Sequence, residues 1–295
     1  MQSLESAARR IEAIGNIAGI VRTMKALSAV NIPSSERAAS AAEAFHETLL
    51  DALHVALRQL PTMTGDDSPM SHGVVIAFGS DHGLCGGFNE SVAAAVASSQ
   101  YLGKGIFAVG YRLDAALRRR GMVADLTLRS AASSEGLRSL AAELILAIDA
   151  QDPGRTALPA VDLVHQVRGQ GNLLSVVHRN LLPLGSAFLR QLRARPWPSP
   201  CLPITLSDPH ALFHDLLRQQ LAVTIYRAGA ASLAAEHAAR LALMTQAERA
   251  LEERLESAES AYRRARQDRI TEELLDILGG FQALGDGPGS FFAQV

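Results

Sequence analysis

The stretch AASLAAEHAARLALMTQAERALEERLESAESAYRRA, residues 230–265, carries the pattern that decides the fold. Apolar and small residues, with one histidine among them, recur there in steps of three and four: Ala230, Leu233, His237, Leu241, Met244, Ala247, Leu251, Leu255, Ala258, Tyr262 and Ala265. Ten steps cover 35 residues, so the mean spacing is 3.5 residues, the period of a coiled coil. The pattern predicts a long helix that packs against another helix.

A second helical stripe lies at the other end of the chain. Its members are Leu4, Ala7, Ile11, Ile14, Ala18, Val21 and Met24. The C-terminal helix is expected to begin at Ser207-Asp208-Pro209, an oxygen-bearing cap followed by proline. Two long end helices predict an antiparallel coiled coil. Pro33 is expected to kink or restart the first helix, because proline lacks an N–H and clashes with the preceding turn.

The middle of the chain alternates between apolar runs and helical stretches. Strands are expected over 73–79, 105–110, 123–128, 161–167 and 173–182, and helices over 89–99, 113–120 and 135–150. Such alternation is typical of a mostly parallel sheet covered by helices. We therefore expect an α/β fold class with four parts: an N-terminal coiled-coil helix (1–60), an α/β domain (72–205), a C-terminal coiled-coil helix (208–284) and a flexible tail (285–295).

Composition excludes several functional classes. The 295 residues have a formal net charge of −2, so no overall basic field indicates nucleic acid binding. Two cysteines are too few for a disulfide framework or a thiolate zinc site. No stretch has the apolar length of a membrane span or a signal peptide, so we expect no direct membrane span. The chain is 48% hydrophobic but only 5% aromatic, and its 49 alanines favour closely packed helices.

One glycine-rich loop invites a chemical interpretation. Residues 79–89, GSDHGLCGGFN, follow a strand and open a helix, where backbone N–H groups can hold a phosphate. The loop lacks both the P-loop ending and the dinucleotide spacing, and tight-turn geometry explains the glycines equally. Cys85 there is either a thiolate nucleophile with His82 as base or a small buried residue. A nucleotide-binding enzyme with a coiled-coil arm is therefore the alternative function, and a scaffold is a third.

Two further groups have ordinary explanations. His210 and His214 share one helix face but lack a third ligand, so no metal or other cofactor is expected. Arginines crowd the C-terminal helix at 263, 264, 266 and 269. They form either a solvated face or a contact surface for charged loops of a surrounding partner.

Three separated motifs resemble the γ (central-stalk) subunit of the F-type ATP synthase. Residues 11–29, IEAIGNIAGIVRTMKALSA, resemble its first helix, and 80–89, SDHGLCGGFN, its Asp-x-Gly-Leu-Cys-Gly-x-x-Asn loop. Residues 236–244, EHAARLALM, and 262–274, YRRARQDRITEEL, resemble its C-terminal helix. The match follows the family's order and spacing over nearly the whole chain.

The resemblance implies a Rossmann-like inserted domain and a rotor function. The γ subunit transmits torque between the membrane ion-translocating c-ring and a hexamer of α and β subunits, and it also contacts ε. It couples ion transport to ATP synthesis or hydrolysis without catalytic residues of its own. The implied location is peripheral, within the F1 complex on the cytoplasmic face of the bacterial inner membrane.

The resemblance also implies individual roles. Arg266, Gln267, Thr271 and Glu273 match shaft positions that contact a loop of β, whereas Met24 and Arg240 match positions facing the β lever region and the opposite helix. Gly83, Cys85, Gly86 and Asn89 match the structural loop. The sequence departs from the family at residues 30–35, VNIPSS, at Phe281 and in the tail. These departures suggest a divergent branch, such as an alternate sodium-type rotary ATPase.

Overall fold

The structure is a computed structural model that describes residues 4–60, 63–65, 73–151, 159–169, 173–197, 199, 201, 203 and 205–285. The chain divides into two compact units. One contains Met1–Met24 and Met244–Val295, and the other contains Lys25–Leu243. Each unit therefore takes part of both long helices, α1 (Leu4–Arg58) and α6 (Pro209–Gly285). Within the described residues, no helix is both long and apolar enough to cross a bilayer.

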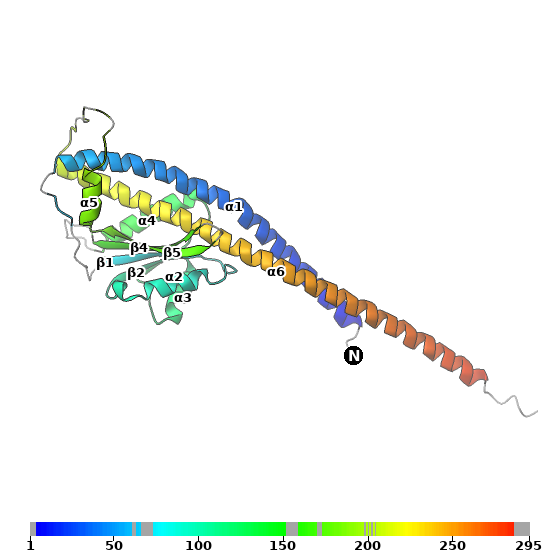
Figure 1. The fold of residues 1–295 in the computed structure, drawn as a ribbon. Coiled ribbons are helices and arrows are strands. Elements are labelled where there is room, and N and C mark those ends of the chain that lie inside the picture. Colours follow the sequence, from blue (N-terminus) through cyan, green and yellow to red (C-terminus); the bar gives the residue numbers. More distant parts are fainter. Residues whose placement is uncertain are drawn as a thin grey trace, which may run out of the picture. The chain divides into compact units, whose positions relative to one another are not determined.

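The first unit is helical. The beginning of α1 and the part of α6 after residue 244 lie side by side and run in opposite directions (Figure 1). The predicted stripes face inward: Ala7, Ile14, Ala18 and Val21 are buried on α1, and Met244 and Ala258 on α6. The other stripe members in this unit all have intermediate exposure. The coiled-coil prediction is confirmed, because both helices bury the faces that the 3.5-residue period selects.

The second unit contains the α/β domain. Its strands are β1 (Gly73–Phe78), β2 (Gly105–Val109), β3 (Leu126–Leu128), β4 (Ala160–Arg168) and β5 (Leu174–Leu182). They form one sheet in the order β3-β2-β1-β4-β5, in which β1 to β4 are parallel and β5 is antiparallel to β4. The expected mostly parallel sheet is confirmed, and the third strand is shorter than the sequence pattern suggests.

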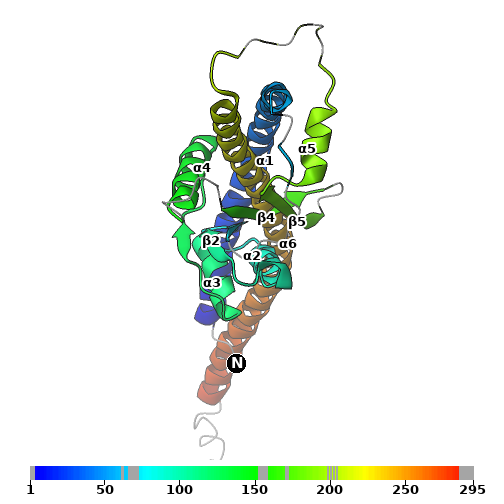
Figure 2. The same ribbon diagram turned by 90° about the vertical axis from the view of Figure 1, so that its left-hand side faces the viewer.

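Helices cover both faces of this sheet (Figures 1 and 2). On one face, α2 (Phe88–Val96) and α3 (Tyr111–Arg119) pack on Val75, Ala77 and Ala108. On the other, α4 (Ser134–Asp149) and α6 pack on alternate residues of the same strands: Val74, Ile76, Phe78, Phe107 and Val109. This alternation follows from the two-residue repeat of a strand.

Glycine allows α6 to approach the sheet closely. A Cβ on Gly229 would lie 2.8 Å from Leu137 Cδ2 and 3.1 Å from Phe78 Cε1. Any larger residue there would push α6 away from α4 and β1. Gly229 therefore marks the contact of the long helix with the domain core.

Two features differ from the sequence expectations. Helix α1 is continuous through Pro33, so of the two alternatives, a kink or a restart, the structure shows no restart. A short helix, α5 (Ser186–Arg193), was not expected, and its Leu189 and Leu192 pack with the end of α1 around Leu53 and Leu57. The start of α6 is confirmed, since the amide of Ala211 donates to the Asp208 carboxylate at 2.9 Å. Residues 286–295 of the expected tail lie outside the described residues.

Candidate functional site

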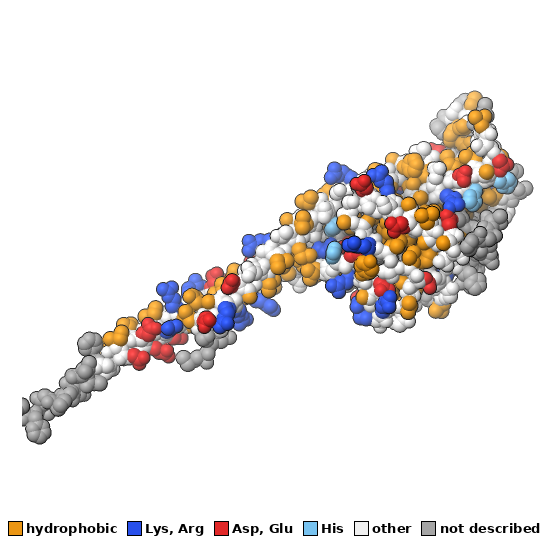
Figure 3. Space-filling model, turned by 180° about the vertical axis from the view of Figure 1, so that it is seen from behind, with side chains coloured by type: hydrophobic (Ala, Val, Ile, Leu, Met, Phe, Trp, Pro, Cys, Tyr) orange, Lys and Arg blue, Asp and Glu red, His pale blue; other side chains and the backbone are white. Residues whose placement is uncertain are grey.

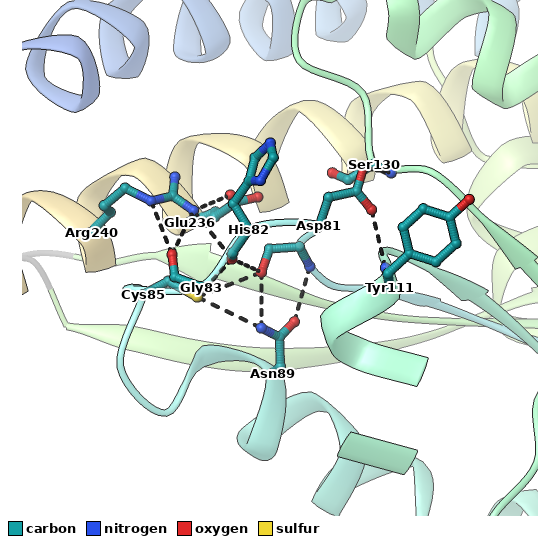
Figure 4. A network of polar contacts seen from close by, with 10 residues as sticks. Asp81, His82, Gly83, Cys85, Asn89, Tyr111, Ser130, Glu236 and Arg240 are labelled. Atoms are coloured by element: carbon teal, nitrogen blue, oxygen red, sulfur yellow. Dashed lines mark hydrogen bonds and ion pairs between the residues drawn. The ribbon is translucent and has the colours of Figure 1, made fainter. Parts of the chain in front are cut away.

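The glycine-rich loop between β1 and α2 is folded around the side chain of Asn89. The Oδ1 atom of Asn89 accepts a hydrogen bond from the backbone N–H of Ser80 at 2.9 Å, and Nδ2 donates to Ser80 Oγ at 2.8 Å. Ser80 Oγ in turn donates to the carbonyl of His82 at 2.9 Å. The first and last parts of the loop are thereby joined by one amide side chain (Figure 4). The loop is therefore a structured turn at the place where the sequence suggested either a turn or a phosphate cradle.

Cys85 lies inside the loop with its side chain only 3% exposed. Its Sγ atom lies 3.5 Å from Ser80 Oγ and 3.6 Å from Asn89 Nδ2. Cys85 and Phe88 pack on Ala235 of α6. Burial raises the pKa of the Cys85 thiol, an effect that outweighs the Ser80 hydrogen bond. A protonated, covered thiol is unsuited to nucleophilic chemistry, so the geometry supports the buried-residue interpretation of Cys85.

Arg240 attaches this loop to α6. Its guanidinium group donates to the carbonyl of Gly83 at 3.4 Å and to the carbonyl of His82 at 3.5 Å. Nη2 also forms an ion pair with Glu236 Oε1 at 2.6 Å, and both side chains are 7% exposed. Burial raises the pKa of Glu236, although the Arg240 charge opposes this rise. The Glu236–Arg240 pair is thus a buried clamp between the long helix and the loop (Figure 4).

Asp81 links the same loop to the neighbouring strand ends. Its Oδ1 accepts from the N–H of Tyr111 at 3.0 Å, at the start of α3, and its Oδ2 accepts from the N–H of Ser130 at 3.1 Å. Gly110, at φ 104°, brings its Cα so close that an added Cβ would lie 2.7 Å from the Ser80 backbone. A carboxylate at a helix start is favoured by the helix dipole. The loop is therefore held by Asn89 from within, by Arg240 of α6 and by the contacts of Asp81 with Tyr111 and Ser130.

The predicted loop residues meet at this site. Gly83 supplies a carbonyl to Arg240, Cys85 and Asn89 lie at the centre, and Gly86 has φ 61°, a conformation that favours glycine. Glu236 and Asp81 lie in the matched motifs, but the sequence alone assigned no role to either residue. An acidic residue four positions before an arginine is a detectable signal for a helical ion pair.

The predicted shaft residues do not join this site. Arg266, Gln267, Thr271 and Glu273 are exposed in the helical unit. Thr271 Oγ1 donates to the carbonyl of Gln267 at 2.9 Å, and Glu273 pairs with Arg269 at 3.1 Å. Met24 has intermediate exposure in the same unit. Their contacts to a partner therefore remain predictions.

One group of side chains has metal-like spacing. Ligand atoms of Glu43, His46 and Glu47, on successive turns of α1, lie within 4.8 Å of one another. Each of the three already has a protein partner: Arg227 for Glu43, Gln220 for His46 and Arg195 for Glu47. Two arginine charges oppose a cation there, and we assign no metal to this group.

The structure combines two antiparallel end helices, a Rossmann-like domain inserted between them and a loop bound to the second helix. This combination defines a class of coiled-coil proteins with an inserted α/β domain. A family model described as ATP synthase matches residues 3–284, and the chain belongs to that family. Within it, the relatives are gamma chains. The chain is 26% identical over 306 residues to the "ATP synthase gamma chain" of Nitratiruptor sp., with 96% of this chain and 100% of that protein covered.

Solved structures show the same fold. A chain of the Euglena gracilis mitochondrial ATP synthase, from a structure of OSCP, F1 and c-ring, has a TM-score of 0.66 at 14% identity, covering 99% of this chain and 98% of that one. A chain from the central stalk and c-ring of the Tetrahymena thermophila mitochondrial ATP synthase has a TM-score of 0.55 at 18% identity, covering 77% and 99%. The fold class and the family expected from the sequence are confirmed, and the nucleotide-binding enzyme is not favoured.

Proposed function

We propose that this chain turns as the rotor of its ATP synthase and transmits torque between the membrane c-ring and a hexamer of α and β subunits. It couples ion transport to ATP synthesis or hydrolysis, contacts an ε subunit and contributes no catalytic residue. Its place is peripheral, on the cytoplasmic face of the bacterial inner membrane. The gamma-chain family membership supports this proposal, as does the fold shared with central-stalk chains.

The surface of the last turns of α6 carries the proposal. All residues from Arg266 to Gly280 are exposed, including five large aliphatic ones: Ile270, Leu274, Leu275, Ile277 and Leu278. Figure 3 shows hydrophobic and charged side chains of both signs interleaved toward the C-terminal end of the helix. Exposed apolar residues on several sides of a helix indicate a surface that a binding partner covers. A surrounding sleeve of α and β subunits would bury this surface.

Contacts that form and break during rotation need weak, exchangeable partners. Arg269 and Glu273 are 65% and 63% exposed in their ion pair, and such a pair contributes only about 0–1 kcal/mol. Arg266 is exposed one turn earlier. These groups can exchange an internal contact for one with β at little cost. We therefore propose Arg266, Gln267, Thr271 and Glu273 as β-contact residues, together with Met24.

Torque must also pass from the long helix to the inserted domain. The Glu236–Arg240 clamp and the apolar contact of Ala235 with Cys85 and Phe88 join α6 to the loop, and through Asp81 the loop reaches α3. Buried hydrogen bonds resist sliding because breaking them leaves unsatisfied polar groups. We propose that Arg240 serves this internal attachment rather than a direct contact with β.

Reconstitution with α and β subunits tests the proposal. Arg266→Ala combined with Glu273→Ala should change ATP turnover or coupling of the assembled complex, whereas the circular dichroism of the free chain should stay the same. Arg254→Ala, an exposed arginine earlier on α6, is the matched control and should behave like the unmodified chain. Equal coupled rates in all three complexes would contradict the β-contact assignment. Robust ATP turnover by the purified chain would contradict a non-catalytic role.

A further inference from the structure

A cavity of about 350 Å³ lies within the α/β unit, between the two long helices and the outer part of the sheet. Its floor is formed by β4 and β5 and its sides by α1 and α6. Alanine, valine and leucine side chains make up much of the wall, and the polar lining consists of Ser40, Glu43, His165, Arg179, Thr224 and Arg227. A volume of this size falls at the lower end of the range for small-molecule sites, roughly 300–1,000 Å³.

The charges around the cavity do not balance. Arg227 pairs with Glu43 at 2.9 Å, and its side chain is only 16% exposed. Arg179 has no ion-pair partner within the described part of the chain. Burial lowers the pKa of Arg227, and the Arg179 charge lowers it further against the effect of Glu43. Two guanidinium groups thus share one cavity with a single carboxylate.

His165 is the buried polar group without a partner in this cavity. The residue is 4% exposed, and its Nδ1 atom has no hydrogen bond. Burial lowers its pKa to about 4, with further contributions from Arg179, Arg227 and His178. The ring is therefore neutral at physiological pH and keeps one N–H donor. Buried polar atoms are nearly always hydrogen-bonded in native proteins, so a partner for this ring is missing.

We propose that this cavity binds an oxyanion of the phosphate class. Arg179 and Arg227 present planar, charged donors, and such groups match the geometry of phosphate oxygens. The His165 ring adds an uncharged donor at the buried end. Thr224 gives its hydroxyl proton to the carbonyl of Gln220 at 2.8 Å, so it adds no donor. The anion would connect α6 with β4 and β5 and hold the helix against the sheet.

Inorganic phosphate titrated into the full-length chain tests this site. Calorimetry at constant ionic strength, balanced with chloride, should show saturable binding. Arg179→Gln should weaken it by about tenfold or more, as expected for loss of a charge-assisted hydrogen bond. Arg58→Gln removes the same charge at the exposed end of α1 and should leave binding unchanged. Absence of saturable binding for both phosphate and ADP, or equal weakening by both variants, would overturn the proposal.

The same variants separate binding from general salt stabilisation. Phosphate strengthens the folding of many proteins by exclusion from their surface, and that effect rises without saturation. A bound anion instead adds a saturable rise in melting temperature. This saturable part should disappear in Arg179→Gln, and its persistence there would overturn the proposal. ADP titrated in parallel identifies the source: binding of phosphate alone indicates the free ion, and tighter binding of ADP indicates a nucleotide phosphoryl group.

His165 gives a direct readout of the cavity. A bound anion favours the charged imidazolium, so phosphate should raise the pKa of His165 when its ring protons and nitrogens are followed by NMR. Burial, followed by the Arg179 and Arg227 charges, keeps this pKa low in the free protein, and a bound anion would offset the two charges, so the shift should be upward and saturable. An unchanged His165 signal at saturating phosphate would place the anion elsewhere and overturn the assignment.

Discussion

The Nη2 atom of Arg240 lies 2.6 Å from Oε1 of Glu236, and both side chains are 7% exposed. The pair occupies one face of α6 at adjacent turns, and Arg240 also donates from Nη2 to the carbonyls of His82 and Gly83 and from Nε to that of Gly83. A buried charge pair stabilises a fold only when its hydrogen bonds are complete. The loop carbonyls give Arg240 further buried hydrogen bonds here.

Arg240→Leu should destabilise the protein strongly. The substitution leaves Glu236 buried without its partner, and breaking a buried pair in this way costs about 3–5 kcal/mol. Urea-induced unfolding measures the loss. Replacing both residues, Arg240→Met with Glu236→Leu, should recover much of it, because no unpaired charge remains.

The exposed pair Arg269–Glu273 is the matched control for this prediction. It has the same four-residue spacing, but its side chains are 65% and 63% exposed. Arg269→Leu should therefore cost no more than about 1 kcal/mol. If the two arginine variants lose equal stability, burial does not determine the strength of the clamp.

The two cysteines should react with thiol reagents at very different rates. Cys201 is exposed, whereas Cys85 is buried and burial raises its thiol pKa. Since the thiolate is the reactive form, an aromatic disulfide reagent should modify one equivalent rapidly and the second only on unfolding. Cys201→Ser should abolish the rapid phase. A rapid phase that survives this substitution would show that the loop opens readily.

Pro33→Ala should stabilise the chain without adding helix. Helix α1 is continuous from Leu4 to Arg58, and proline inside a helix is less favourable than alanine by about 3 kcal/mol. Part of this cost is reduced when the helix bends, so we expect a gain of about 1–3 kcal/mol in the free energy of unfolding. Far-UV circular dichroism should stay the same. A clear increase in helical signal would show that the helix is broken at Pro33 in solution.

Protonation of His165 should destabilise the protein at mildly acidic pH. Burial and nearby positive charges lower its pKa from 6.5 to about 4. The unfolded state therefore takes up the proton first as the pH falls. The stabilising contribution, about 3 kcal/mol from the size of this shift, is fully present above pH 6.5 and is lost progressively down to about pH 4.

Unfolding free energies measured across this range test the linkage. The difference between the unmodified chain and His165→Gln should shrink as the pH falls from 6.5 to 4. His237 has its pKa lowered to about 4 by burial and by Arg240, and it contributes equally to both chains, so the comparison isolates His165. A pH-independent difference for His165→Gln would contradict the prediction.

Periodic patterns were sufficient to predict the main elements. The 3.5-residue stripe on residues 230–265 and the stripe from Leu4 to Met24 identify their own buried faces, because each residue's position on a helix follows from its place in the sequence. Strands and helices of the middle domain followed from the same reasoning. Helix α5, with only eight residues, is too short to display such a repeat, and it depends on packing against α1.

Local preference alone did not decide the effect of Pro33. The sequence left a kink or a restart open there, and α1 continues without a restart, with Ile32 and Ser35 buried on either side of the proline. Tertiary packing over a 55-residue helix outweighs the penalty at one position. The Ser35 hydroxyl also donates to the carbonyl of Asn31 at 3.0 Å, within the turn that contains the proline.

The sequence alone determined the coiled-coil faces, the alternating α/β order and the family, because these depend on residue spacing along the chain and on motifs that are contiguous. Tertiary structure decided the chemistry of individual side chains. Arg240 meets Gly83, and Arg179 meets Arg227 and His165, only after folding brings distant segments together. Burial, charge balance and missing hydrogen bonds are properties of that arrangement in space, and no spacing in the sequence encodes them.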